Sequence, residues 1–139
     1  MADNKIAVTV DSVVFCKTNN LFKVLLIQRN NEPFKDQWAL PGGFVDEGED
    51  LETAAKRELK EETGVVVKSM EQVQAFGNSG RDPRGHTISI AFLSRIFCEE
   101  DLTPSDDAQD ARWVAVEDLP DIELAFDHDE IINVAQQFL

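Results

Sequence analysis

Apolar residues along the chain occur mainly in short runs rich in Val, Ile and Phe, and several of these runs alternate with polar positions, which is typical of β-strands. Five segments have this pattern and are predicted to be strands: residues 6–16, 21–29, 65–76, 86–98 and 112–116. The polar segments that contain the turn-forming residues are predicted to be loops: residues 30–43, 77–85 and 99–111. No repeat or break in composition divides the chain, so one domain is expected over residues 1–139.

Two further segments have apolar residues at helical spacing. The first covers residues 51–63, has acidic residues in its first turn and is followed by Gly64, a common helix stop. The second covers residues 127–138, with Asp127 as the expected N-cap and Glu130 three residues later, as in a capping box. Strands combined with one central and one terminal helix predict an α/β domain that is layered around a mixed sheet.

The helix predicted at residues 51–63 carries three glutamates, Glu58, Glu61 and Glu62, within the sector of its apolar residues, while its lysines lie opposite. Like charges at this spacing repel by about 0.2–0.5 kcal/mol per pair. Carboxylates on a buried face are also costly unless they are paired or bind cations, and a single arginine, Arg57, lies beside them. Two interpretations remain: a site for a hard divalent cation such as Mg²⁺ or Mn²⁺, or a salt-bridged structural cluster.

The sequence around this helix, GGFVDEGEDLETAAKRELKEETGV, has a second regularity in its spacing. Its fixed positions are Gly43, Glu49, Arg57, Glu58, Leu59, Glu61, Glu62, Gly64 and the apolar Val65. This segment resembles the Nudix box of the Nudix hydrolase family and matches it at every defining position. The resemblance implies the family's α/β/α sandwich with a central mixed β-sheet. It also implies hydrolysis of a nucleoside diphosphate linked to another group, by a metal-activated water.

The resemblance further implies roles for individual residues. The ligands of a catalytic Mg²⁺ or Mn²⁺ would be Glu58, Glu61, Glu62 and a backbone carbonyl of Gly42 or Gly43. Arg57 and Glu49 would pair and hold the loop against the helix, which orients the metal ligands. Gly43 and Gly64 would occupy backbone turns that a Cβ would obstruct. Glu58, Glu61 and Arg57 are therefore expected to belong to the catalytic machinery.

A stretch downstream of the box, GRDPRG, resembles that of Nudix proteins acting on ADP-ribose and of Nudix domains in regulators of NAD metabolism. Arg81 and Arg84 could each bind a phosphate or ribose oxygen with a forked guanidinium, on a loop stiffened by Pro83. The alternative is an exposed loop with two solvated arginines. Arg29 and Gly42 are further candidate contacts of the substrate. The resemblance therefore favours ADP-ribose, split into AMP and ribose 5-phosphate.

The Nudix box leaves the general base open. The candidates in the acidic loop are Glu99, Glu100, Asp106, Asp107 and Asp110, and Glu58 is the alternative. Asp106 and Asp107 are preferred because Pro104 and Ser105 before them predict a defined turn, and Asp107 is taken as the catalytic candidate. The aromatic residues that could stack on adenine are Phe34, Trp38 and Phe76, although each is also typical of a core position.

The chain has 13 basic and 27 acidic residues, and the net charge is -14. A nucleic acid is not expected as a partner, because phosphate-backbone binding needs a basic surface. A small nucleoside-diphosphate substrate remains compatible when metal cations mediate the contact. No apolar run is long enough for a bilayer and the N-terminus lacks a secretory pattern, so we expect a cytoplasmic protein without membrane contact.

Two cysteines, Cys16 and Cys98, lie in apolar runs outside any C-x-x-C pair, and we expect buried free thiols. The functional hypothesis is a Mg²⁺-dependent ADP-ribose pyrophosphatase, with a homodimer compatible with the resemblance. Two alternatives stay open: a hydrolase that removes oxidised dNTPs from the nucleotide pool, and a Nudix domain that senses ADP-ribose without cleaving it.

Overall fold

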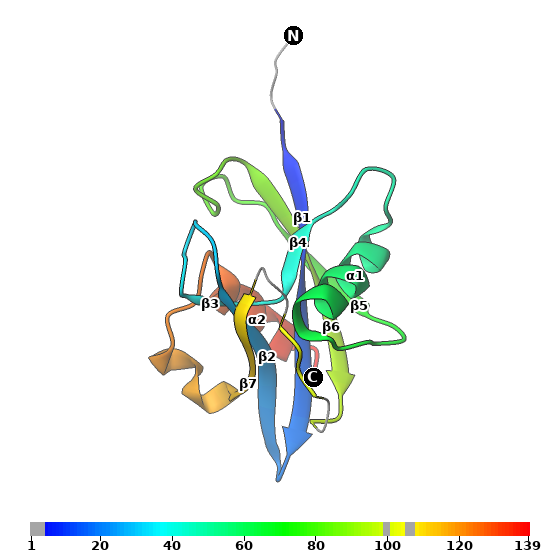
Figure 1. Cartoon of the computed structure of the whole chain (residues 1–139), viewed down its shortest axis with the longest axis vertical. Helices are drawn as coiled ribbons and strands as arrows, with labels where there is room; N and C mark the ends of the chain where they lie inside the picture. The colour runs from blue at the N-terminus through cyan, green and yellow to red at the C-terminus, as the bar shows by residue number, and fades with distance from the viewer. Residues whose placement is uncertain (1–4, 99–100, 105–107) are drawn as a thin grey trace.

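The long apolar run near the N-terminus forms β1 (Ala7–Thr18), the central strand of a mixed β-sheet (Figure 1). The computed structural model describes residues 5–98, 101–104 and 108–139. The other strands are β2 (Leu21–Arg29), β3 (Trp38–Ala39), β4 (Gly42–Phe44), β5 (Glu71–Phe76), β6 (Thr87–Ile96) and β7 (Ala108–Ala115). The helices are α1 (Leu51–Thr63), the 3₁₀ helix η1 (Val116–Asp121) and α2 (His128–Gln136). Within these described ranges, no helix is long and apolar enough to cross a membrane.

The sheet has the order β3–β2–β1–β6–β5. β1 runs parallel to β6, in a register that extends from Ala7↔Thr87 to Cys16↔Ile96. The other neighbours are antiparallel: β4 pairs with the first half of β1, β2 pairs with its second half, and β7 lies along β2. The mixed sheet predicted from the sequence is confirmed.

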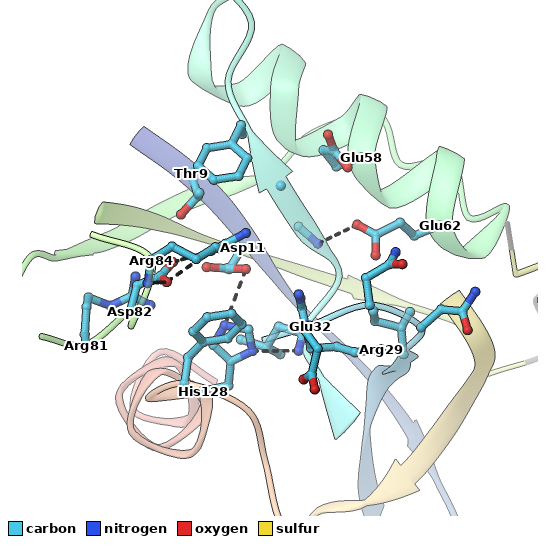
Figure 2. Close-up of a pocket in the computed structure, with 18 of the residues that line it drawn as sticks. Thr9, Asp11, Arg29, Glu32, Glu58, Glu62, Arg81, Asp82, Arg84 and His128 are labelled. Carbon is cyan, nitrogen blue, oxygen red and sulfur yellow. Dashed lines mark hydrogen bonds and ion pairs between the residues drawn. The ribbon is translucent and has the colours of Figure 1, made fainter. Parts of the chain in front are cut away.

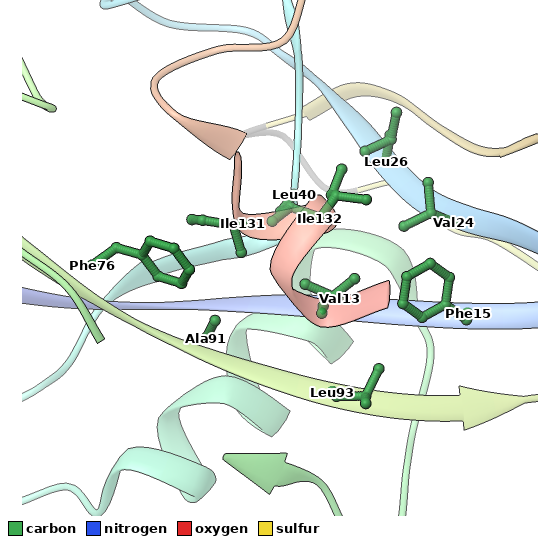
Figure 3. Close-up of a cluster of buried hydrophobic side chains, with 11 residues drawn as sticks. Val13, Phe15, Val24, Leu26, Leu40, Phe76, Ala91, Leu93, Ile131 and Ile132 are labelled. Atoms are coloured by element: carbon green, nitrogen blue, oxygen red, sulfur yellow. The ribbon is translucent and has the colours of Figure 1, made fainter. Parts of the chain in front are cut away.

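Alternate residues of β1 point to opposite faces of the sheet, because side chains of a strand alternate with a period of two. Val10 and Val14 pack in the cluster that contains the apolar face of α1. Val13 and Phe15 pack in the cluster that contains the apolar face of α2 (Figure 3). The sheet therefore carries one helix on each face, which is the predicted α/β/α sandwich.

The observed elements depart from the sequence prediction where strand pairing, rather than the local pattern, sets their bounds. Residues 30–43 were expected to be loop, yet they contain β3 and the start of β4, strands of 2 and 3 residues that are too short to show a period. Only Glu71–Phe76 of the strand predicted at 65–76 is formed. β7 begins at Ala108 instead of residue 112, because its polar first residues pair with β2. β2 and α1 have the predicted bounds.

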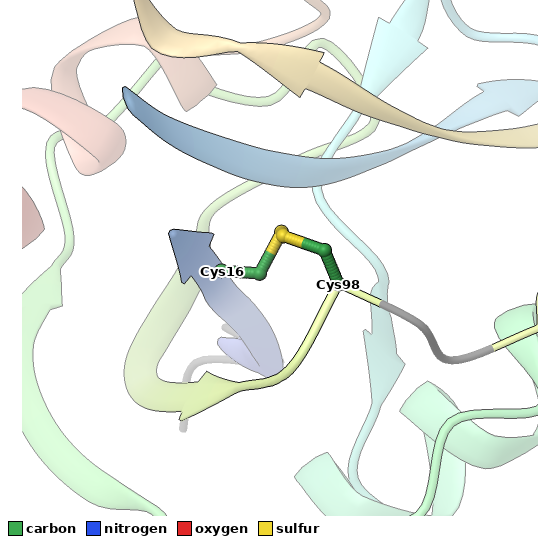
Figure 4. The surroundings of a disulfide bond; sticks show 2 residues. All are labelled: Cys16 and Cys98. Atoms are coloured by element: carbon green, nitrogen blue, oxygen red, sulfur yellow. A yellow bond between two sulfur atoms is a disulfide. The ribbon is translucent and has the colours of Figure 1, made fainter. Parts of the chain in front are cut away.

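Cys16 and Cys98 form a disulfide, so the prediction of two buried free thiols is wrong (Figure 4). The register of the parallel strands explains the pairing: Cys16 lies opposite Ile96, and Cys98 follows just beyond the end of β6. The two Cα atoms are 5.2 Å apart, although 82 residues separate the cysteines in the sequence. No local sequence pattern signals a contact over that separation.

We predict that breaking this disulfide destabilises the fold without unfolding it. In the chain-entropy account, cross-linking residues so far apart in sequence restricts the unfolded chain, and such bonds contribute about 2–4 kcal/mol. Denaturant unfolding of the wild-type protein should therefore shift to lower denaturant when a thiol reductant is added. Cys98→Ser should show the lower stability from the start and no response to reductant. Alkylation of both cysteines in the native, unreduced protein would contradict the disulfide.

Candidate active site

A cleft of about 380 Å³ lies where β1, β4, α1 and the start of α2 meet. Its wall on the α1 side carries Glu58 and Glu62, Arg84 lies across the cleft from them, and Arg29 comes from the end of β2 (Figure 2). Asp11 of β1 lies between them, and Phe126 also lines the cleft. The cleft therefore brings carboxylates and guanidinium groups together.

Glu58 and Glu62 lie on the cleft side of α1, as the sequence predicted. Glu62 is buried, and its Oε1 accepts a hydrogen bond from the Gly42 amide at 3.0 Å. Burial raises the pKa of Glu62, and the nearby charge of Glu58 raises it further. Burial likewise raises the pKa of Glu58, although Arg57 acts in the opposite direction. A buried carboxylate pair of this kind is stabilised by a bound cation or by a proton.

Glu61 does not share this buried face, and here the sequence prediction is wrong. Its side chain is 56% exposed and contacts Arg57 at 3.3 Å. On the helical wheel Glu61 lies about 80° from the centre of the apolar sector, so a small rotation of the helix turns it to solvent. In the part of the chain that the structure describes, no three His, Cys, Asp or Glu side chains converge as metal ligands would.

Arg57 contacts several carboxylates on the α1 side of the cleft. It donates two hydrogen bonds to Glu49, at 2.7 and 2.9 Å, and one to the Phe44 carbonyl at 3.2 Å. Its remaining terminal nitrogen donates to Glu58 at 2.9 Å and to Glu61 at 3.3 Å. The loop between β4 and α1 is thus fastened to the helix by the expected pair of Arg57 and Glu49, and the same guanidinium holds two further carboxylates.

The two glycines of the box occupy positions where a larger residue would collide. A Cβ on Gly43 would lie 2.6 Å from the carboxyl carbon of Glu58, so only glycine lets β4 approach the carboxylates of α1 this closely. Gly64 ends α1 in the left-handed region, at φ 80°, and its amide donates to the Lys60 carbonyl. A Cβ at Gly64 would also meet the side chain of Thr103.

Arg29 and Arg84 both reach the cleft. The guanidinium of Arg84 lies between two rings, 4.9 Å from the centroid of Phe44 and 5.5 Å from that of Phe126, and is paired with Asp82 at 2.7 Å. The guanidinium of Arg29 lies 5.0 Å from the Phe126 centroid. Arg29 donates to the Pro33 carbonyl but makes no salt bridge with any described residue. Burial lowers the pKa of Arg29, and so does the neighbouring charge of Arg84.

Arg81 differs from the other two arginines because a carboxylate already occupies its forked face. Its side chain is 4% exposed, and it donates to both oxygens of Asp127, at 2.9 and 2.5 Å. The alternative of a solvated loop arginine therefore does not hold for Arg81. Its predicted role in binding substrate does not fit this geometry either, because Asp127 occupies the guanidinium. Asp127 occupies the N-cap position of α2, but its side chain makes no capping hydrogen bond, so the predicted capping box is not formed.

The predicted general bases of the acidic loop and the predicted stacking residues have different surroundings. Glu99, Glu100, Asp106 and Asp107 lie outside the described residues. Asp110 accepts hydrogen bonds from the Ala111 amide and from Arg112, so its carboxylate is occupied. Phe76 belongs to the core, and the ring of Trp38 lies against Arg112. Phe34 packs edge-on against Phe126, with the ring centroids 4.8 Å apart.

Sequence reasoning missed three residues of the cleft: Asp11, Phe126 and His128. An acidic residue within the apolar run of β1 is itself a signal, because a buried carboxylate needs a partner. Asp11 has that partner, since the Ser89 hydroxyl donates to it and His128 Nε2 lies 3.6 Å away. Phe126 and His128 give no comparable signal, because a single aromatic or histidine before a helix is common in any fold.

Comparison with known proteins agrees with this geometry. Residues 6–134 match the NUDIX domain family. The chain belongs to the Nudix family.

Two relatives and one solved structure show where this Nudix chain lies within the family. It is 46% identical over 127 residues to the ADP-ribose pyrophosphatase of Methanocaldococcus jannaschii, covering 91% of this chain and 71% of that protein. It is 37% identical over 129 residues to the ADPR responsive transcriptional repressor NtrR of Acinetobacter baylyi. That match covers 91% of this chain and 52% of the repressor, so the chain spans about half of the repressor's length. The NUDIX domain of Shewanella oneidensis NrtR, solved with ADP ribose, superposes with a TM-score of 0.91 at 36% identity, covering 96% of this chain and 88% of that one.

The contacts of the Nudix box predict a specific dependence of stability on pH. Hydrogen bonds from Arg57 lower the pKa of Glu49 from 4.5 to about 2. A carboxyl whose pKa is lowered by folding stabilises the folded state above its unfolded pKa, and loses that contribution as the pH falls through its folded pKa. Wild-type protein should therefore be more stable than Glu49→Gln above pH 4.5, and this difference should shrink between pH 4.5 and about 2.

Thermal unfolding of both proteins across this pH range measures the difference. Glu47→Gln changes an exposed glutamate in the same loop and is the matched control, whose curve should follow that of the wild type. A difference between wild type and Glu49→Gln that stays constant with pH would show that the Arg57–Glu49 pair is not its source.

Proposed function

We propose that this Nudix domain, spanning residues 1–139, is a divalent-metal-dependent hydrolase that splits ADP-ribose into AMP and ribose 5-phosphate. The observation that carries the proposal is the meeting of carboxylates and guanidinium groups in one cleft, which is lined by Glu58, Glu62, Arg29 and Arg84. A diphosphate in this cleft would meet both guanidinium groups and metal-binding oxygens. The similarity to an ADP-ribose pyrophosphatase and to a domain solved with ADP ribose supports this substrate.

Arg29 gives the strongest support for an anionic ligand. It is half-buried beside a second cation, Arg84. The carboxylates that act on its charge without forming a salt bridge with it are those of Glu62, Asp82 and Asp11. Two neighbouring cations repel, and an anion between Arg29 and Arg84 would lower that cost. Gly42, the remaining predicted contact, lines the same cleft and donates its amide to Glu62.

The donor set on the α1 side of the cleft suits a hard cation. Glu58 and Glu62 offer carboxylate oxygens at a buried position where both pKa values are raised, and Gly43 adds a nearby backbone carbonyl. Mg²⁺ or Mn²⁺ prefers these ligands, and Glu61 would join them by leaving Arg57. A bound divalent cation would lower the pKa of a water molecule and neutralise charge on the diphosphate.

Other residues of the chain would bind the substrate, position the metal ligands and act as the general base. Arg29 and Arg84 would bind and orient the diphosphate, while Phe44 and Phe126 shield these guanidinium groups from water. Arg57 and Glu49 would hold the loop and the metal-binding carboxylates in position. The general base would be Asp107, which lies outside the described residues, with Glu58 as the alternative.

A second candidate is a domain that binds ADP-ribose without cleaving it. It is favoured by the similarity to an ADPR responsive repressor, and by the capture of Glu58 and Glu61 by Arg57. The retention of every acidic residue of the Nudix box favours the enzyme. A hydrolase for oxidised dNTPs has the same metal chemistry, but none of the observations above points to recognition of such a base.

A cytoplasmic location, a homodimer and the absence of a nucleic-acid partner belong to the same proposal. The net charge of -14 argues against binding to the phosphate backbone of a nucleic acid. The similarity to a transcriptional repressor is the observation that favours DNA as a partner. The disulfide weakens the cytoplasmic assignment, because disulfides are rare in reducing compartments.

The substrate is tested by incubating the protein with Mg²⁺ or Mn²⁺ and a panel of nucleoside-diphosphate derivatives, with chromatographic identification of products. We expect ADP-ribose to give AMP and ribose 5-phosphate, and expect no turnover after chelation of the metal. Rapid cleavage of oxidised dGTP with ADP-ribose untouched would overturn the substrate. Calorimetric binding of ADP-ribose without turnover in either metal would instead establish the sensing domain.

Glu62→Gln separates metal chemistry from folding. Glutamine keeps an oxygen that can accept the Gly42 amide, so the fold should persist, but the negative charge is lost. We expect kcat to fall by about 100-fold or more, and Mn²⁺ affinity to fall by about 10- to 100-fold. Near-full activity in this variant would show that Glu62 is not a metal ligand.

Arg29→Gln is the complementary variant at the arginines of the cleft. Removing one charged hydrogen-bonding group from the diphosphate should raise the KM for ADP-ribose by about tenfold or more, while Mn²⁺ affinity stays at the wild-type value. A loss of Mn²⁺ affinity in Glu62→Gln alone, and a rise in KM in Arg29→Gln alone, would separate metal binding from diphosphate binding.

A further inference from the structure

Three consecutive residues before and at the start of α2, Phe126 to His128, each contact a residue of the cleft. The ring of Phe126 lies beneath Arg29 and Arg84, and Asp127 holds Arg81. The ring of His128 lies 5.3 Å from that of Phe126, and its two nitrogens face Asp11 of β1 and the Leu40 amide. Among these three residues, His128 is the one that hydrogen-bonds to the segment leading to Gly42 and Gly43.

His128 is held in one orientation. It is 4% exposed, and its Nδ1 accepts a hydrogen bond from the Leu40 amide at 2.9 Å. Because Nδ1 accepts, the proton of the neutral ring is on Nε2, which faces Asp11 at 3.6 Å. The other oxygen of Asp11 is bound by the Ser89 hydroxyl. Burial lowers the pKa of His128, consistent with a neutral ring that can accept from a backbone amide.

The segment that His128 holds leads directly to the carboxylates. Ala125 donates to the Trp38 carbonyl at 2.8 Å, and Pro41 accepts from the Ser12 amide at 2.8 Å. Two residues after Leu40, the Gly42 amide donates to Glu62. The Leu40 amide and the Pro41 carbonyl of this short connection therefore each have a partner, and the partner of the Leu40 amide is a side chain from near the other end of the chain.

The approach of this segment to α1 is also close. A Cβ at Gly43 would lie within 2.7 Å of both Glu58 carboxyl oxygens, so a small displacement of β4 changes the space around them. The position of Leu40 sets where the next residues can lie, because consecutive Cα atoms are about 3.8 Å apart. A group that fixes the Leu40 amide thus limits the distance between Gly42–Gly43 and both carboxylates.

We propose that His128 is a positioning residue: through its Nδ1 bond to Leu40 it sets the place of Gly42 and Gly43 against Glu58 and Glu62, and thereby the metal-binding geometry of the cleft. This inference rests on the proposed function for its catalytic consequence. The hydrogen bond and its effect on metal binding stand independently of the substrate.

Two substitutions test the role of Nδ1. Asparagine places its carbonyl oxygen near the position of Nδ1, whereas glutamine reaches toward the position of Nε2, so His128→Asn can keep the bond to Leu40 and His128→Gln cannot. Amide hydrogen exchange of Leu40, Mn²⁺ affinity by calorimetry, and kcat and KM for ADP-ribose are measured for both.

In His128→Gln we expect exchange at Leu40 to accelerate about tenfold, the effect of losing one hydrogen bond, and Mn²⁺ affinity and kcat to fall by a similar factor. KM should change less than about twofold. His128→Asn should restore all three quantities to within about threefold of the wild type. Equal behaviour of the two variants, or unchanged Leu40 exchange in His128→Gln, would overturn the inference.

Two further measurements keep the test decisive. In ¹⁵N-labelled wild-type protein, a scalar coupling across the hydrogen bond should connect the Leu40 amide nitrogen with His128 Nδ1. Its absence would overturn the inference even when neither variant folds. When the wild type binds Mn²⁺ but leaves ADP-ribose intact, the proposed function fails, while exchange and Mn²⁺ affinity still decide the role of His128.

Discussion

The parallel pairing of β1 with β6 is the constraint on which both the core and the cleft depend. Parallel strands need a long connection, and here the chain between them contains β2, β3, β4, α1 and β5. Since side chains of β1 alternate between faces, valines of this strand pack against both helices, and Asp11 lies on the α2 side. The same register places Cys16 beside Cys98 and lets Ser89 of β6 reach Asp11.

The cleft brings carboxylates and guanidinium groups of several distant segments together. The Gly42 amide donates to Glu62, and Gly43 lies against Glu58. The guanidinium groups of Arg29 and Arg84 both lie against the ring of Phe126. Burying an unpaired ion costs several kcal/mol after relaxation. Arg57 pairs with Glu58 and Asp82 pairs with Arg84, whereas Glu62 and Arg29 make no salt bridge with a described residue. An ionised Glu62 would therefore be stabilised by a cation in the cleft, and Arg29 by an anion.

Much of this arrangement follows from local sequence. The bounds of α1, the cleft-facing positions of Glu58 and Glu62 and the pair of Arg57 and Glu49 were predictable, because spacing within one helix and its adjoining loop determines them. Glu61 was misplaced because it lies at the edge of the apolar sector, where the wheel does not decide between cleft and solvent.

The remaining differences come from contacts between distant segments. Arg81 is occupied by Asp127, 46 residues away, and Cys16 by Cys98, 82 residues away. His128 and Leu40 lie 88 residues apart. None of these pairs has a periodic pattern, because each depends on where two elements meet after the sheet has formed. The sequence therefore predicts the chemistry of α1 more closely than the support that holds it.

Arg57 connects the two functional alternatives in physical terms. Its two bonds to Glu49 fasten the loop, and one of its terminal nitrogens donates to both Glu58 and Glu61. A divalent cation at Glu62 would compete with Arg57 for these two carboxylates, and Arg57 could release both while keeping Glu49. In an enzyme, the attraction of Glu58 and Glu61 to the cation would exceed their attraction to Arg57. In a sensing domain, the attraction to Arg57 would be the stronger one. Because an arginine and a divalent cation both carry positive charge in the same space, strong binding of one weakens the hold of the other on these carboxylates.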